Sequence, residues 1–145
     1  MTSFVLDASV AAKWFLPPSR EPYALEAERV LEHYVAGKCS LTVPDLFWPE
    51  LGNILSKSAR RGEISLSSCG LAVEHLELLR LPTLPSEPLL ARALTIALDF
   101  QRPFYDCEYV ALAVESRTPL LTADERLVNA LGAHFPVQWL GSVSF

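Results

Sequence analysis

Short apolar runs alternate along the chain with longer segments in which apolar and polar residues follow a helical period. The short runs are rich in β-branched and large apolar residues, which is typical of buried strands. They fall at Ser3–Leu6, Leu41–Val43, Pro119–Thr122 and Val137–Leu140. Helices are predicted at Ala8–Leu16, Pro22–Ala36, Asp45–Arg61 (opened by Pro44-Asp45), Ser65–Leu81, Ser86–Gln101, Tyr105–Ser116 and Ala123–Leu131. Strands that alternate with helices form a parallel sheet with helices on both faces, so the sequence predicts an α/β fold.

Length and composition narrow the class of protein. The 145 residues fit a single domain over 1–145, and 50% hydrophobic with 20% charged residues excludes a disordered chain. No apolar run approaches the ~20 residues of a membrane span, and the first residues lack the basic segment of a signal peptide. The three cysteines are dispersed without C-x-x-C spacing, which indicates a reducing compartment and argues against zinc. We therefore expect a cytoplasmic protein with no membrane partner.

The net charge limits how the chain could bind nucleic acid. Twelve basic and 17 acidic residues give a charge of −5, whereas domains that bind nucleic acid by bulk charge are usually basic. An enzyme whose metal ions supply the positive charge stays compatible with this balance.

Candidate chemistry lies where predicted strands end. In parallel α/β sheets the ligand crevice lies beyond the carboxyl ends of the strands. Asp7 directly follows the first predicted strand, and Asp124 comes two residues after Thr122 at the end of another. Asp106 opens the helix that leads into the strand before Asp124. These carboxylates could converge on one crevice.

A fourth carboxylate, Glu50, lies near the start of a predicted helix. Asn53 and Lys57 follow it at helical spacing on the same face. Apolar residues crowd around Glu50 in the sequence, and an acid in such a setting needs a partner. Carboxylates with open coordination positions suit Mg²⁺ or Mn²⁺, which can activate water and stabilise an in-line attack at phosphorus.

Helix capping offers a structural explanation for several of these residues. Asp106 and Asp45 could cap helices, because acids are favoured at helix N-termini. Thr122 and Glu125 fit a capping box, which would leave Asp124 free for chemistry. For Ser9, a capping role is favoured over contact with metal-bound water.

Four motifs, in order and covering nearly the whole chain, resemble PIN-domain ribonucleases, and in particular the VapC-type toxins of toxin–antitoxin pairs. The motifs are Phe4-Val5-Leu6-Asp7-Ala8-Ser9, Pro49-Glu50-x-x-Asn53-x-Leu55, Tyr105-Asp106-x-x-Tyr109-x-Ala111-Leu112-Ala113 and Leu121-Thr122-Ala123-Asp124-x-x-Leu127. The resemblance implies a parallel sheet of about five short strands and a metal-dependent endoribonuclease. It also implies a homodimer and a groove that accepts a segment of a cognate antitoxin.

Residue by residue, the resemblance implies an acidic quartet of catalytic metal ligands with two accessory polar side chains. The quartet is Asp7, Glu50, Asp106 and Asp124, and the accessory residues are Ser9 and Asn53. Cys107 and Glu108 stand where small residues are more usual, which brings an extra carboxylate near the site. We read Cys107 as a buried packing residue.

The mechanism expected from these residues is hydrolysis of RNA by a metal-activated water, because no histidine or cysteine is well placed as a nucleophile. Lys57, Arg60 and Arg61 are the candidates for contacts with the RNA backbone. Single-stranded or looped RNA is the expected substrate.

Two other functions compete with this interpretation. Asp7 could be the nucleophile of aspartyl-phosphate chemistry, but the second acid expected two residues later is replaced by Ser9. The chain could also be a catalytically inert PIN-fold module that binds RNA or protein. An intact quartet argues against the inert module, because clustered carboxylates repel one another unless a cation is present.

Aromatic residues on the first predicted helices suggest a surface for partners. They exceed what one small core obviously needs, and they are Trp14, Phe15, Tyr23, Phe47 and Trp48. Ordinary core packing is the competing explanation.

Overall fold

A computed structural model describes residues 1–145 and contains one five-stranded parallel sheet. Its strands are β1 (Thr2–Leu6), β2 (Cys39–Pro44), β3 (Thr83–Leu84), β4 (Leu120–Thr122) and β5 (Val137–Trp139). They lie in the order β3-β2-β1-β4-β5, and every pair of neighbours is parallel. The predicted α/β class and the five-stranded sheet are confirmed.

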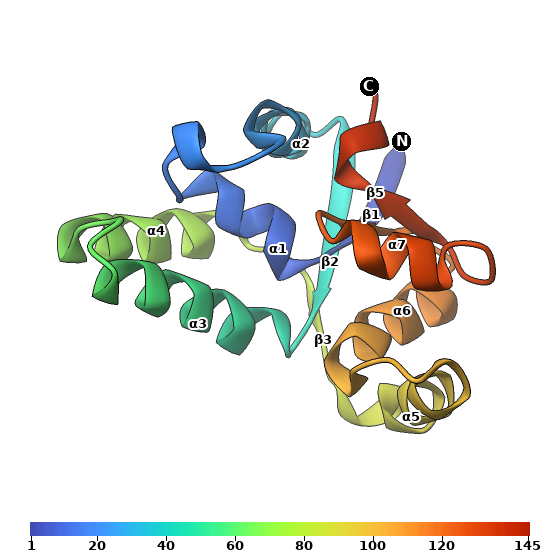
Figure 1. Cartoon of the computed structure of the whole chain (residues 1–145). Coiled ribbons are helices and arrows are strands. Elements are labelled where there is room, and N and C mark those ends of the chain that lie inside the picture. Colours follow the sequence, from blue (N-terminus) through green and yellow to red (C-terminus); the bar gives the residue numbers. More distant parts are fainter.

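Seven α-helices flank the sheet. They are α1 (Ala8–Ala11), α2 (Ala24–Val35), α3 (Phe47–Arg60), α4 (Leu66–Leu79), α5 (Leu90–Phe100), α6 (Phe104–Ser116) and α7 (Glu125–Leu131). Helices α1 to α4 lie on one side of the strands and α5 to α7 on the other (Figure 1). The chain leaves β1 toward one side and β4 toward the other, and these two strands are neighbours. Such a switch in direction opens a crevice at the carboxyl ends of the two strands.

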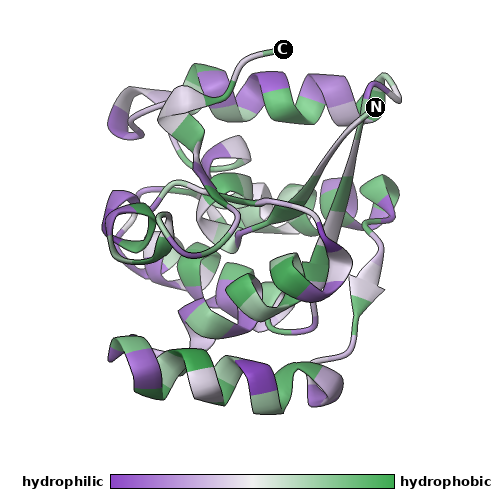
Figure 2. Cartoon of the chain, turned by 90° about the vertical axis from the view of Figure 1, so that its right-hand side faces the viewer, coloured by the Kyte–Doolittle hydropathy of each residue, from purple (hydrophilic) through white to green (hydrophobic).

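The core runs through the centre of the sheet and under α6. Val5 and Leu6 of β1 and Leu120 and Leu121 of β4 are fully buried, as parallel strands covered on both faces require. Cys107 of α6 is also fully buried and free, which agrees with its predicted packing role. The outer helices are striped with polar and apolar residues, as α2 shows along the top of Figure 2.

Most predicted elements are present within a few residues of their expected limits, and three larger differences concern two helices and one strand. The helix expected over 8–16 is the short α1 followed by a 3₁₀ turn at Ala12–Trp14. Pro44 ends β2 instead of opening a helix, and α3 begins at Phe47, so Pro49 falls in its first turn, where a missing N–H costs nothing. Strand β3 was not predicted, because its two exposed residues stand between prolines that indicate a break; it is an edge strand.

The aromatic residues of the first helices are largely packed within the fold, which corrects the idea that they form a partner surface. Phe47 is fully buried, and Trp14, Phe15 and Trp48 pack against the core. The Trp14 indole N–H donates to the Ala27 carbonyl at 2.8 Å. Tyr23 alone of the five is exposed. In addition, no helix is long and apolar enough to cross a membrane.

Candidate active site

Each of the four predicted acids stands on a different element around the crevice between β1 and β4. Asp7 directly follows β1, and Asp124 immediately precedes α7, two residues beyond β4. Glu50 lies at the fourth residue of α3 and Asp106 at the third residue of α6. Their charges act on one another: Asp7 and Asp124 both raise the pKa of Asp106, and Asp7 and Asp106 both raise the pKa of Glu50. The fold thus brings four acids from distant parts of the sequence into one electrostatic cluster.

Asp7 is held by a network that joins the ends of the two central strands. The Thr122 hydroxyl donates to Asp7 Oδ2 at 2.7 Å, and the Ser9 backbone N–H donates to Asp7 Oδ1 at 3.3 Å. Burial raises the pKa of Asp7 above its ordinary value, while the hydrogen bonds from Thr122 and Ser9 oppose this rise and the charge of Asp124 adds to it. The protein therefore both buries the Asp7 carboxylate and supplies hydrogen bonds to its ionised form.

Capping roles at this edge differ from those predicted. Asp124, not Thr122, caps α7, because Asp124 Oδ1 accepts from the N–H groups of Arg126 and Leu127 at 3.0 and 3.4 Å. The capping box of Thr122 and Glu125 is therefore wrong: Thr122 is fully buried, and its hydroxyl bonds Asp7 and accepts from the Asp124 N–H. The same Asp124 that lies in the cluster thus also begins a helix.

Ser9 joins the two sides of the crevice. The cap of α1 is Asp7, so the predicted capping role of Ser9 is wrong. The Ser9 hydroxyl instead accepts from the Ala123 N–H at 3.1 Å and thereby ties the start of α1 to the loop after β4.

Glu50 lies beside a buried tyrosine. Its Oε1 atom and the Tyr109 hydroxyl are both buried without a well-formed hydrogen bond. Burial raises the pKa of Glu50, the nearby Tyr109 hydroxyl lowers it, and the charges of Asp7 and Asp106 raise it again. Burial, the charges of Asp7 and Glu50 and the contact with Glu50 raise the pKa of Tyr109, which therefore keeps its proton. An unpartnered buried carboxylate oxygen is the polar atom that a cation would satisfy.

Asp106 faces the one basic group that acts on the cluster. Its Oδ2 atom lies 3.6 Å from Arg102 Nη2, and both side chains are partly exposed. Burial and the charges of Asp7 and Asp124 raise the pKa of Asp106 to about 6, and Arg102 opposes the rise. A capping role for Asp106 is not seen, because Pro103 occupies the N-cap of α6 and no side chain bonds there.

The extra carboxylate, Glu108, is 5% exposed and points toward the end of β2. Burial raises its pKa, the Ser86 hydroxyl lowers it, and the Asp45 charge raises it. Asp45 does not cap α3: its carboxylate accepts from the Ser86 N–H at 3.1 Å. The charge of Glu108 also raises the pKa of Glu50, so Glu108 borders the cluster.

The residues around the crevice fit a hydrated divalent cation. No three His, Cys, Asp or Glu side chains come close enough together to enclose a bare ion. Mg²⁺, however, is usually bound through one or two carboxylates and keeps several waters. Glu50 and Asp106, whose pKa values are raised by burial and by the charges of nearby acids, together with the unpartnered Glu50 Oε1, supply the donor chemistry for such an ion.

The remaining predicted site residues extend along α3 from Glu50. Asn53 is exposed one turn further on, and Lys57 is exposed about 10 Å along the helix from Glu50. Arg60 and Arg61 are exposed at the C-terminal end, about 15 Å from Glu50 along the axis. The basic residues thus form a track leading away from the acids and do not belong to the cluster.

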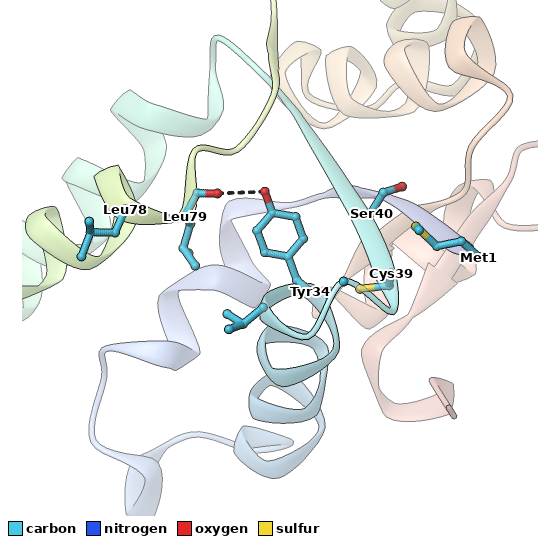
Figure 3. Close-up of a pocket in the computed structure, with 8 residues that line it drawn as sticks. Met1, Tyr34, Cys39, Ser40, Leu78 and Leu79 are labelled. Carbon is cyan, nitrogen blue, oxygen red and sulfur yellow. Dashed lines mark hydrogen bonds between the residues drawn. The ribbon is translucent and has the colours of Figure 1, made fainter.

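A cavity of about 400 Å³ lies at the opposite end of the sheet (Figure 3). Met1, Cys39 and Ser40 place it at the amino ends of β1 and β2, and the Tyr34 hydroxyl donates to the Leu79 carbonyl beside it at 2.9 Å. None of the four acids lines this cavity. This cavity is therefore separate from the candidate active site, which is the acidic cluster at the carboxyl ends of β1 and β4.

A parallel α/β domain with four acids around its switch point defines a recognisable class of protein. The PIN-domain family profile matches residues 4–131, and the chain belongs to this family. It is 37% identical over 89 residues to Ribonuclease VapC1 of Mycobacterium tuberculosis, in both the CDC 1551 / Oshkosh and H37Rv strains. That match covers 61% of this chain and 66% of the relative, just under two thirds of its length.

Two solved structures share the fold. A crystal structure of PAE2754 from Pyrobaculum aerophilum matches with a TM-score of 0.71 and 23% identity, covering 97% of this chain and 85% of that one. A toxin–antitoxin complex from Klebsiella pneumoniae matches with a TM-score of 0.58 and 17% identity, covering 93% and 95%.

The sequence interpretation missed three contributions to the site. The hydroxyl of Thr122 was assigned to a cap, and Tyr109 was quoted in a motif without a role. Arg102 was not singled out, although it precedes Asp106 by four residues, a spacing at which opposite charges meet.

Proposed function

We propose that this chain is a metal-dependent endoribonuclease of the VapC type, the toxin of a toxin–antitoxin pair, which hydrolyses RNA phosphodiester bonds. The observation that carries the proposal is the cluster of Asp7, Glu50, Asp106 and Asp124, four acids from separate elements; burial and the charges of neighbouring acids raise the pKa of Asp7, Glu50 and Asp106. Burying acids together weakens a fold unless a cation joins them. The relationship to proteins named as ribonucleases supplies the substrate class.

The four acids together are proposed to hold Mg²⁺, with Mn²⁺ as the alternative, one or two of them directly and the others through the waters that the ion keeps. When bound, the ion would activate a water molecule for attack on phosphorus and offset the charge of the phosphate. Thr122 and the Ser9 backbone fix Asp7 and favour its ionised form, while the Asp124 carboxylate is oriented by its cap on α7. Ser9 ties the start of α1 to the loop after β4, and Asn53, exposed one turn beyond Glu50, is the proposed accessory polar group.

RNA would approach along α3. Lys57, Arg60 and Arg61 are exposed on that helix and would contact backbone phosphates, which makes binding sensitive to salt. Single-stranded or looped RNA can be splayed into an open crevice, so it is the preferred substrate.

The test is cleavage of labelled RNA with Mg²⁺, with Mn²⁺ and with excess EDTA, followed by analysis of the product ends. A water nucleophile leaves 5′-phosphate and 3′-hydroxyl ends, and EDTA abolishes turnover while the circular dichroism spectrum keeps its folded shape. Asp7→Asn is the inactive control, and asparagine retains the cap of α1. Cleavage that persists in EDTA, or 2′,3′-cyclic phosphate ends, would refute this mechanism. Metal binding without cleavage of any RNA would instead favour an inert binding module.

The proposed partners are a cognate antitoxin and a second copy of this chain, in the cytoplasm, where RNA is available. One of the similar structures is described as a toxin–antitoxin complex, which supports the first. Inhibition of the RNA cleavage by the product of a small open reading frame immediately upstream would test it.

A further inference from the structure

Arg102 occupies a fixed position at the edge of the acidic cluster, in the segment between α5 and α6. Gln101 ends α5 in the left-handed region at φ 53°, and the Arg102 N–H donates to the Ala97 carbonyl at 3.1 Å. Pro103 follows with a restricted φ of −55°. The backbone that carries the guanidinium is therefore held on both sides.

The guanidinium itself is poorly partnered. Its contact with Asp106 is 3.6 Å, whereas charge-assisted N–H···O bonds are about 2.7–2.9 Å. Its Nε atom is buried and has no partner. An arginine carries five donors in a planar fork that matches a carboxylate or a phosphate, and here the fork meets a single carboxylate oxygen loosely.

The charges around the Arg102 guanidinium favour binding of an anion together with a cation. Arg102 is the positive charge that acts on Asp106, whereas the basic residues of α3 begin about 10 Å from Glu50 along the helix. A phosphate drawn to a divalent ion at the cluster would come within reach of this partly exposed guanidinium. No protein group other than Asp106 forms an ion pair with it.

We propose that Arg102 is a substrate-binding residue of the active site, whose N–H groups bind a non-bridging phosphate oxygen of RNA at the acidic cluster while Asp106 holds the side chain in place. This inference rests on the proposed nuclease function and adds the residue that positions the phosphate. It predicts that Arg102 governs RNA affinity near the site, separately from the track along α3.

Binding is measured by fluorescence anisotropy of a labelled single-stranded RNA with Mg²⁺, at several salt concentrations. The protein carries Asp7→Asn, so that the RNA stays intact. Adding Arg102→Gln should weaken binding roughly tenfold, the effect of losing one charge-assisted hydrogen bond. It should also reduce the slope of log K against log salt by about 0.7, the value for one phosphate contact on a single strand. Arg102→Lys should keep the slope and recover part of the affinity.

The matched control is Arg92→Gln in the same background. Arg92 is also an arginine with one acidic partner, since its Nε lies 2.7 Å from Glu115 Oε1, but it is exposed on α5 away from the cluster. The Arg92→Gln substitution removes the same charge and should leave the RNA affinity and the salt slope unchanged. Equal affinity and slope for Arg102→Gln and Arg92→Gln would overturn the inference.

Two further measurements distinguish a failure of the role proposed for Arg102 from a failure of the proposed nuclease function. In the active protein, Arg102→Gln should raise the KM for RNA more than it lowers kcat, and its melting temperature should stay near that of the wild type. A fall in kcat and melting temperature with KM unchanged would assign Arg102 a structural role and refute the proposal. If the wild type cleaves no RNA with any divalent ion, the nuclease function fails, and the binding measurement still decides the role of Arg102.

Discussion

Replacing Asp106 by asparagine should make the metal-free protein more stable at neutral pH while removing its activity. Burial and the charges of Asp7 and Asp124 raise the pKa of Asp106 to about 6 from 3.8. An acid whose pKa is raised by folding contributes its full stability below the lower value, and that contribution is lost as the pH rises through the higher one. At pH 7.5 the ionised Asp106 carboxylate therefore destabilises the folded state, whereas the uncharged asparagine does not.

The size of the effect follows from the same values. A rise in the pKa of Asp106 from 3.8 to about 6 corresponds to at most roughly 3 kcal/mol of unfolding free energy, at 1.36 kcal/mol for each pKa unit. The Asp106 side chain is 30% exposed, so solvent screening reduces the expected gain to about 1–2 kcal/mol. For a domain of this size that gain raises the melting temperature by roughly 3–6 °C.

The assay is thermal unfolding of wild type and Asp106→Asn in EDTA at pH 4.5 and pH 7.5. The variant should be more stable at pH 7.5, and the difference should be much smaller at pH 4.5, where Asp106 in the folded protein is largely protonated. Addition of Mg²⁺ at pH 7.5 should stabilise the wild type more than the variant. Asp99→Asn, which changes an exposed acid of α5, is the control and should shift neither curve. A variant that is equally destabilised at both pH values would refute the reasoning, because charge repulsion would not then be the dominant effect at Asp106.

Three further predictions concern the network, the metal and the assembly. Thr122→Val leaves Asp7 Oδ2 and the Asp124 N–H without their hydroxyl partner, so it should lower stability by roughly 2–4 kcal/mol in chemical denaturation; an unchanged midpoint would contradict this. Calorimetry should detect Mg²⁺ or Mn²⁺ binding that is lost in Asp7→Asn and that weakens as the pH falls, because the raised pKa values of Asp7, Glu50 and Asp106 let protons compete with the ion. Binding that survives in Asp7→Asn would mean that the site is misassigned. Light scattering at tens of micromolar should give the mass of a dimer, and a monomer would count against the homodimer.

The sheet and its carboxyl edge could be predicted from the sequence, because they follow from local patterns, and the same patterns put Asp7 and Asp124 next to strand ends. A buried apolar run followed by Asp7, or by Thr122-Ala123-Asp124, marks the carboxyl end of a parallel strand wherever it occurs. The helices were also predictable from their periodicity and their proline or glycine boundaries.

The sequence failed where a contact between distant segments decides the outcome. Strand β3 exists because β2 pairs with it, and its own two residues carry no strand signal. Thr122 resembles a local cap, yet its hydroxyl bonds an acid at the other end of the chain. The Arg102 guanidinium contacts Asp106, and the charges of Asp7 and Asp124 act on Asp106 in turn. Neither Asp7 nor Asp124 is near Arg102 in the sequence.

The hydrogen bond from Thr122 to Asp7 closes a loop of 115 residues. Asp7 is synthesised 115 residues before Thr122, so its hydrogen bond with Thr122 and the Ser9–Ala123 contact can form only after residues 122 and 123 have left the ribosome. A partly made chain therefore holds at most three of the four acids. It also lacks the end of β4, whose Thr122 hydroxyl bonds Asp7. If the protein is a nuclease, this order of assembly keeps it inactive beside the messenger and ribosome that are producing it.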